Sequence, residues 1–268
     1  MKLGIIIPLK SKIVSQNWNI TCENLKNTLE SIINQKNNQY TTLVIGHEKP
    51  DFMNNDRYNS KKIEFLRIRE FDPPKISEDL NRNQVLYEKD RCSKILKGII
   101  HLKITDPHIN YWYPLDADDL IHCDFTEEIS KIVSRTSVDA IIFEKGYVLY
   151  KNKKTFNKEN NFALYCGSSA IVHDSALSNQ EILATEEYKS FLFGQVPHTA
   201  MHEVLASRQL KIEVPKKRLV LYCKDHGENI SDETRPNNIS YSLKRKIKLA
   251  IKKIYFTKKI MDNFSISQ

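Results

Sequence analysis

At 268 residues, with 40% hydrophobic and 28% charged residues, the chain is long enough to bury a sizeable core, and we expect it to fold without disulfides. Its length fits one large α/β domain or one domain with a smaller appended lobe, and we favour the second. The five cysteines are odd in number, widely spread and never spaced as CxxC, which argues against a disulfide framework and a zinc site and fits a reducing cytoplasm.

The first half of the chain alternates predicted strands with predicted helices. A buried strand is expected at residues 3–8, an apolar run that meets a proline and is too short for a signal peptide or a membrane span. A helix follows, with Asn19 or Thr21 as candidate caps and apolar residues at helical spacing. The pattern then predicts strands at 41–45, 63–68 and 111–115 and a helix at 85–102. This order indicates a parallel sheet covered by helices, in which ligands bind at the carboxyl ends of the strands.

The second half of the chain is less regular, and its sequence contains no visible internal repeat. Small residues at 167–169, within the segment 163–172, permit a close approach of the backbone. The other expected elements are strands at 138–143 and 147–150, a polar loop at 151–161, a helix within 192–210 and a strand over 212–222.

Three carboxylates in four residues, Asp116, Asp118 and Asp119, come directly after the strand expected at 111–115. Acids this close repel one another, and at the end of a buried strand they are costly unless a cation or hydrogen-bond donors neutralise them. A divalent metal is the simplest neutraliser, and such ions usually bind through one or two carboxylates together with substrate phosphates. The motif therefore predicts a phosphate-bearing ligand. The alternative interpretation is a polar turn that happens to be acidic.

Five features stand in a defined order over roughly residues 1–232. They are an Ile-Ile-Pro first strand, a helix with Asn24-Leu25 and Ser31-Ile32, an acidic end of the second strand, the acidic motif, and His226-Gly227-Glu228-Asn229-Ile230-Ser231. Together they resemble glycosyltransferase family 2 enzymes with the glycosyltransferase A fold. The resemblance implies an α/β fold with a mostly parallel, Rossmann-like sheet flanked by helices. It implies a nucleotide-sugar-binding half at 1–125, an acceptor-binding half at 126–232 and a basic helical tail at 233–268.

The resemblance also implies ligands for the acidic motif. Asp118 is the expected ligand of a divalent metal, Mn²⁺ or Mg²⁺, and Asp116 shares the metal or meets the ribose of a nucleotide-sugar. Asp119 either joins this set or serves as a helix cap or as an acceptor behind it. His226 is a candidate third metal ligand or phosphate contact, and the alternative is a surface histidine in a turn.

Four further residues of the expected donor site follow from the resemblance. Pro8 ends the first strand and is expected to shape the pocket that binds the donor. Glu48 stands where many family members carry two adjacent aspartates, one of which receives the nucleotide base, although His47 beside it departs from that pattern. Gly167 and Ser168, in the run Gly167-Ser168-Ser169, resemble a stretch that lines the donor sugar and the acceptor in related enzymes; the alternative is that these small residues only permit packing.

The helix expected at 85–102 carries three more candidates for the donor site. Related transferases have basic residues on this helix, so Arg91 and Lys94 are expected to face phosphate or ribose, with Asp90 beside them. Asp90 and Lys94 also have the i,i+4 spacing of a modest surface ion pair, and that interpretation stays open.

An inverting sugar transfer needs a general base near the acceptor hydroxyl. Family members often show Glu-Asp opening a helix in the acceptor half, and the matching place here reads His202-Glu203. Glu203 is therefore the candidate catalytic base, with His202 as its partner or substitute. His198 and His202 are spaced i,i+4, but the order HxxxHE differs from HExxH, which argues against a zinc site.

The segment 240–259 combines lysines and arginine with apolar residues on one helical face, in a chain of net charge +8. Basic amphipathic helices lie in membrane interfaces or on anionic partners, and the alternative is a helix packed on the domain. We expect this segment to bring a cytoplasmic enzyme to the inner leaflet, near a saccharide or lipid-linked saccharide acceptor. Nucleic acid is not an expected partner, because no reader motif accompanies the charge.

These patterns together predict a metal-dependent, inverting glycosyltransferase that uses a nucleotide-sugar in bacterial surface polysaccharide synthesis, such as capsule or lipopolysaccharide. One alternative is a sugar-phosphate nucleotidyltransferase, which opens with a glycine-rich loop after its first strand; residues 8–12 lack glycine. The other alternative is a non-catalytic scaffold with a degenerate transferase fold.

Overall fold

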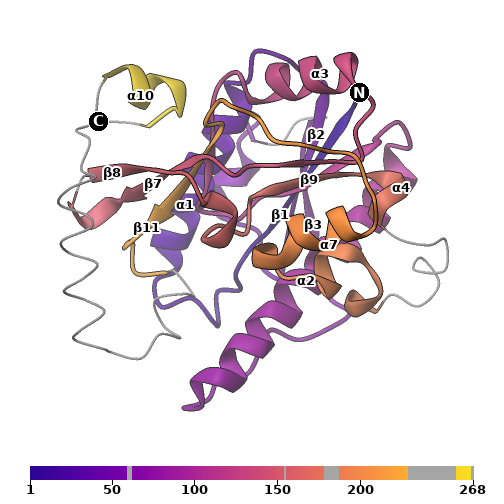
Figure 1. Cartoon of the computed structure of the whole chain (residues 1–268). Helices are drawn as coiled ribbons and strands as arrows, with labels where there is room; N and C mark the ends of the chain where they lie inside the picture. The colour runs from indigo at the N-terminus through magenta and orange to yellow at the C-terminus, as the bar shows by residue number, and fades with distance from the viewer. Residues whose placement is uncertain (59–61, 154, 178–186, 229–257, 267–268) are drawn as a thin grey trace, which may run out of the picture.

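A computed structural model describes residues 1–58, 62–153, 155–177, 187–228 and 258–266 (Figure 1). Its central feature is a seven-stranded sheet in the order β10-β6-β9-β4-β1-β2-β3. The strands β3, β2, β1 and β4 run parallel, and β9 is antiparallel to both of its neighbours. The seven strands are β1 (Leu3–Pro8), β2 (Tyr40–Gly46), β3 (Ile63–Arg67), β4 (Tyr111–Pro114), β6 (Ala140–Ile142), β9 (Ala170–His173) and β10 (Ile212–Glu213).

Helices cover both faces of this sheet, as the alternation of side chains along the central strands requires. Ile5 and Ile7 of β1 pack in one core with α1 (Trp18–Ile33) and α3 (Phe125–Arg135). Ile6 faces the opposite core, which contains α2 (Leu80–Thr105). The amino-terminal half of α2 extends away from the body of the molecule (Figure 1), where Leu80 and Val85 are exposed.

A second, four-stranded sheet follows the order β5-β11-β7-β8 and lies beside the first (Figure 1). Its strands are β5 (Leu120–Ile121), β11 (Val220–Lys224), β7 (Gly146–Tyr150) and β8 (Thr155–Glu159). The helix α10 (Lys258–Asn263) packs against this sheet through the following residue, Phe264, which is 1% exposed. The carboxyl-terminal residues 258–266 thus belong to the folded body.

Several short elements connect the sheets, and each has its own bounds. The short α-helices are α4 (Asp174–Leu177), α6 (Leu192–Gln195) and α7 (Met201–Ser207). The 3₁₀ helices are η1 (Asp51–Asn54), η2 (Lys151–Lys153), η3 (Phe162–Leu164), η4 (Tyr188–Ser190) and η5 (His198–Ala200).

The expected fold class is confirmed: the chain is a mixed α/β protein with a mostly parallel sheet flanked by helices. The polar loop expected at 151–161 is wrong, because Phe156 is fully buried there and β8 pairs with β7. The strand expected over 212–222 is two strands in different sheets. The helix expected within 192–210 is present as α7, directly after the 3₁₀ helix η5, and both follow Pro197.

The two expected halves of the catalytic domain are interwoven in the structure. Strands β6, β9 and β10, all after residue 125, complete the sheet that β1 begins. Of the basic segment predicted at 240–259, residues 240–257 lie outside the described residues. Within the described part of the chain, no helix combines the length and the apolar character that crossing a membrane requires.

Candidate active site

A cleft of about 500 Å³ opens where β1 and β4 end, at the carboxyl edge of the parallel strands. Parallel α/β sheets bind ligands at this edge because loops and helix termini converge there. The predicted site residues that line the cleft are Pro8, Asp90, Arg91, Asp116, Asp118, Gly167 and His226. The sequence therefore identified one wall of a real cleft.

Arg91 and Asp116 form the central ion pair of the cleft, with Nε of Arg91 2.7 Å from Oδ1 of Asp116. Burial opposes the charge of Arg91, but the neighbouring carboxylate of Asp116 holds its pKa above the ordinary value. The Nη2 atom of Arg91 is buried and has no hydrogen-bond partner among the described residues. A buried donor without a partner is costly, so this atom marks a place where a ligand oxygen fits.

Gly167 gives this ion pair its space. A Cβ atom added at Gly167 would lie 2.6 Å from Oδ2 of Asp116 and 3.0 Å from Nη2 of Arg91. Real Cβ atoms do not approach so closely, so any larger residue would displace the pair. The lack of a side chain at Gly167 therefore leaves the space that the Arg91–Asp116 ion pair occupies, whereas the sequence suggested only a close backbone approach.

Asp119 lies behind the cleft and is completely buried. Its Oδ2 accepts hydrogen bonds from Ser168 Oγ at 2.7 Å and from Cys166 Sγ at 3.2 Å. Its Oδ1 accepts the backbone N–H of Cys223 at 3.2 Å. Burial first, and then the charges of Asp118 and Asp116, raise the pKa of Asp119 well above its ordinary value. Asp119 thus ties the acidic motif to β9 and β11, which is the supporting role left open as an alternative.

Ser168, expected to line the donor sugar, is instead part of this support. It is fully buried, donates to Asp119 and accepts the backbone N–H of Asp116 at 2.9 Å. The cleft is lined by its neighbours Gly167 and Ser169. Ser169 is 1% exposed, and its Oγ has no hydrogen-bond partner in the described part of the chain. Ser169 belongs to the stretch expected to line the donor sugar, but three small residues in a row do not show which of them face the cleft.

His226 faces Asp118 across the cleft, with its Nε2 2.8 Å from Oδ2 of Asp118. Its Nδ1 accepts the backbone N–H of Glu228 at 3.3 Å and lies 3.1 Å from Nδ2 of Asn24. Lys151 donates to Oδ1 of Asn24 and so fixes the orientation of that amide. Because Nδ1 accepts, Nε2 carries the proton and donates to Asp118. In this tautomer His226 is a hydrogen-bond donor at the cleft, and not a metal ligand through Nε2.

Lys94 was expected to face phosphate, but it is fully buried and does not line the cleft. Its Nζ donates to Oδ2 of Asp90 at 2.6 Å and to the carbonyl of Leu9 at 2.9 Å. Burial lowers the pKa of Lys94, and Asp90 opposes that change. His47 lies 3.4 Å from the other oxygen of Asp90. The i,i+4 pair is therefore a buried connection between α2 and the ends of β1 and β2.

Glu48 does not line the cleft either, so its expected contact with a nucleotide base is not in place. Its carboxylate accepts hydrogen bonds from Ser11 Oγ at 3.1 Å and from the backbone N–H of Lys12 at 2.9 Å. Glu48 thereby holds the loop between β1 and α1. The sequence correctly placed a carboxylate at the end of β2, but in the structure this carboxylate accepts hydrogen bonds from the protein's own loop after β1.

The expected catalytic pair, Glu203 and His202, is exposed on α7 and does not line the cleft. Nδ1 of His202 lies 2.7 Å from Oε1 of Glu144, outside the site. Other residues of this segment line the cleft instead: Phe193 of α6, His198 and Thr199 of η5, and Met201 at the start of α7.

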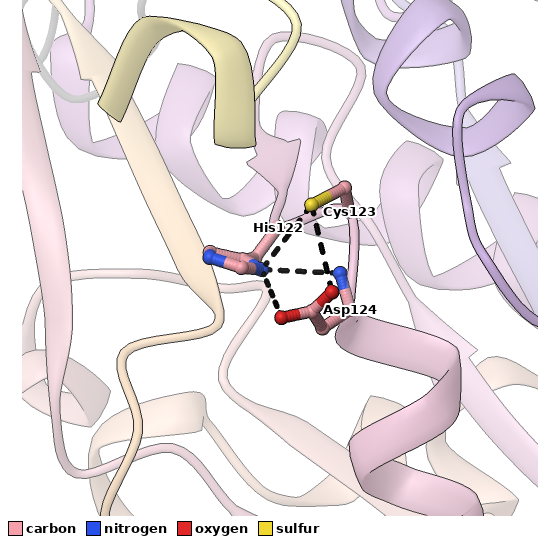
Figure 2. A group of neighbouring side chains, drawn as sticks. All are labelled: His122, Cys123 and Asp124. Carbon is pink, nitrogen blue, oxygen red and sulfur yellow. Dashed lines mark hydrogen bonds and ion pairs between the residues drawn. The ribbon is translucent and has the colours of Figure 1, made fainter. Parts of the chain in front are cut away.

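His122, Cys123 and Asp124 place potential metal-binding atoms within 4.8 Å of one another (Figure 2). Both carboxylate oxygens of Asp124 are already 2.5 Å from lysine ammonium groups, those of Lys36 and Lys217. Nδ1 of His122 accepts the backbone N–H of Asp124 at 3.1 Å. With its oxygens paired to lysines and its imidazole engaged, this group connects β5 to α3 and does not fit a cation.

A divalent metal fits the acidic motif better, through carboxylates alone. Asp116 and Asp118 are partly exposed in the cleft and offer the hard oxygen ligands that Mg²⁺ and Mn²⁺ prefer. Two carboxylates leave room for the oxygens of a bound phosphate, which is the usual way these ions meet a nucleotide.

No family model matches the sequence, and no curated protein matches it. Among solved structures, the chain is similar to S. aureus TarS 1–349 in complex with UDP-GlcNAc, at 14% identity and a TM-score of 0.48, covering 94% of this chain and 66% of that one. The UDP complex of the same protein gives 12% identity and a TM-score of 0.48, covering 84% and 61%. A nucleotide-diphospho-sugar transferase from Desulfovibrio desulfuricans G20 gives 10% identity and a TM-score of 0.40, covering 94% and 97%.

The chain spans about 60% of the length of the first TarS structure that it matches. At identities of 10–14%, these neighbours are likenesses of fold and not of substrate.

Proposed function

We propose that the chain is a glycosyltransferase that moves a sugar from a nucleotide-sugar to a saccharide hydroxyl. The observation that carries this proposal is the cleft at the carboxyl edge of the parallel sheet. There, two carboxylates, Asp116 and Asp118, lie beside Arg91, whose buried Nη2 has no hydrogen-bond partner in the part of the chain that the structure describes. Carboxylates can bind a divalent cation, and the arginine can donate to an anion. A diphosphate bound together with its metal ion needs both kinds of group.

The residues of the cleft have distinct tasks in such a transfer. Breaking the bond between an anomeric carbon and a diphosphate develops negative charge on the leaving phosphate. Nη2 of Arg91 donates to an oxygen of that phosphate, and Gly167 leaves the space in which it does so. A Mn²⁺ or Mg²⁺ ion held by Asp118 and Asp116 would supply further neutralisation of that charge. Ser169 offers a buried hydroxyl to a hydroxyl of the donor.

The arrangement of the first loop disfavours the nucleotidyltransferase alternative. A phosphate loop after β1 would need backbone N–H groups at the start of α1. The N–H groups of Gln16 and Asn17 donate instead to the buried carboxylate of Glu228. The side chain of Asn17 accepts the N–H groups of Asn19 and Ile20, so four N–H groups at this end of the helix are already engaged.

The finer parts of the proposal concern pathway and place. An inverting transfer to a saccharide or a lipid-linked saccharide, in bacterial surface polysaccharide synthesis on the cytoplasmic side, follows the resemblance in the sequence. Contact with the membrane surface would involve 240–259, of which 240–257 lie outside the described residues.

Titration calorimetry with UDP-, GDP-, CMP- and dTDP-sugars, with and without Mn²⁺, tests the proposal. We expect one nucleoside diphosphate class to bind, with chelation or Asp118→Asn weakening its affinity about tenfold or more, as loss of metal support does elsewhere. Asp56→Asn, at an exposed loop position away from the cleft, is the matched control and should bind like the wild type. Failure of all four classes to bind the wild type contradicts the proposal. Binding that Asp118→Asn leaves unchanged supports a scaffold without metal chemistry.

A further inference from the structure

Most titratable groups of the cleft are already engaged by other parts of the protein. Asp116 pairs with Arg91, and Asp118 accepts a hydrogen bond from His226. The carboxylate of Glu228 accepts from Lys10 and from two backbone N–H groups, and Asp90 accepts from Lys94. Glu88 and His198 also line the cleft and can each take a proton; Glu88 is exposed, and His198 is the more buried of the two.

His198 lines the cleft from η5, directly after Pro197. The backbone carbonyl of Leu164 and the charged side chains of Arg91 and Asp116 lie near its ring. Because a carbonyl can only accept, it favours the tautomer whose ring N–H faces Leu164. In neutral imidazole the other nitrogen then presents a lone pair.

The surroundings keep this imidazole neutral. Burial first, and then the positive charge of Arg91, lower the pKa of His198. A neutral imidazole is what a general base requires, because its lone pair is available when substrate arrives.

The neighbouring residues fit a sugar acceptor. Tyr165 and Thr199 line the same cleft, and Tyr165 is 40% exposed. An exposed aromatic ring at a cleft edge offers an apolar face against which a sugar ring packs. The acceptor would therefore enter over Tyr165 and place its hydroxyl next to His198.

We propose that His198 is the catalytic base of the transfer, in place of Glu203 and His202, which lie outside the cleft. This inference rests on the proposed function. His198 takes the proton of the acceptor hydroxyl while that oxygen forms a bond to the anomeric carbon of the donor. The bond from that carbon to the diphosphate oxygen breaks, and its electron pair leaves with the nucleoside diphosphate. The proton remains on His198 until it passes to solvent.

The test compares His198→Gln and His198→Ala with the wild type and with His108→Gln, a control at an exposed histidine outside the cleft. Donor affinity is measured by calorimetry, and turnover by release of nucleoside diphosphate with a panel of methyl hexopyranosides as acceptors. We expect kcat to fall on the order of 10²–10⁴-fold in both His198 variants, the range for loss of a general base. The donor Kd should stay within about threefold, because His198 does not hold the diphosphate. Added imidazole should restore turnover in His198→Ala but not raise that of the wild type.

Each other outcome has a definite meaning. Wild-type kcat in His198→Gln, or a loss of activity in Glu203→Gln that His198→Gln does not share, overturns His198 as the base. So does a loss of donor affinity in both His198 variants without rescue by imidazole, which is the signature of a structural role. A wild type that neither binds nor consumes any nucleotide-sugar is the failure of the proposed function itself, and His198 then loses its reaction.

Discussion

Asp119→Ala tests whether the support behind the cleft is built as described. The substitution leaves the backbone N–H of Cys223 and the hydroxyl of Ser168 without their acceptor in a fully buried place. Each buried donor left unpaired costs about 1–3 kcal/mol, so we expect the two together to lower the free energy of unfolding by about 2–6 kcal/mol. The thiol of Cys166 is a weak donor and adds little.

Asp119→Asn is the matched variant, because its amide oxygen can still accept from Cys223 and its volume is unchanged. Burial raises the pKa of Asp119, so the amide also avoids the cost of a buried charge. We expect a loss of about 1 kcal/mol or less, within the range of a conservative change. Urea unfolding followed by the fluorescence of the buried Trp112 measures both variants. An alanine variant as stable as the asparagine variant would refute the idea that these hydrogen bonds carry the support.

Three further predictions follow from other contacts. Burial lowers the pKa of His122 to about 4, so the folded state takes up a proton on this ring less readily than the unfolded chain. The free energy of unfolding should therefore fall by roughly 3 kcal/mol at most as the pH drops from about 6.5 toward 4. Urea unfolding across this range should show a smaller fall for His122→Asn, which keeps an acceptor for the N–H of Asp124. Gly167→Ala should weaken donor binding about tenfold in calorimetry, as misplacement of site residues does, because its Cβ would lie 2.6 Å from Oδ2 of Asp116; wild-type affinity would contradict that geometry. Glu228→Gln should accelerate hydrogen exchange at the backbone amides of Gln16 and Asn17, and exchange at the wild-type rate would mean that the carboxylate does not hold this loop.

The central sheet could be predicted because its strands are continuous apolar runs. All six residues of β1 and all seven of β2 are buried, and strands buried on both faces can be recognised from the sequence as continuous apolar runs. The short strand β8 could not be predicted in this way, because its segment is mostly polar and only Phe156 packs in the core of the four-stranded sheet. The helix expected within 192–210 could be predicted and is present as α7, after the 3₁₀ helix η5.

The candidate site was predicted where its position follows from the end of a strand. Asp116 and Asp118 reach the cleft because β4 ends just before them. Spacing within a helix was less informative, since Arg91 and Lys94 are three residues apart, yet only Arg91 lines the cleft. His198, which we propose as the base, lies in η5, and the sequence pattern does not show which residues of η5 and α7 face the cleft.

The acidic motif itself shows how a correct prediction can rest on an incomplete reason. Close carboxylates need neutralisation, and here each one has its own protein donor: Arg91 for Asp116, His226 for Asp118, and the buried hydroxyl and N–H groups for Asp119. Repulsion alone therefore does not require a cation, because these donors already offset it in the folded chain. The case for a phosphate-bearing ligand comes instead from exposure and from Arg91. Two of the three carboxylates line the cleft. Beside them, the buried Nη2 of Arg91 is a hydrogen-bond donor for which the described part of the chain supplies no acceptor, so a ligand oxygen can fill that role.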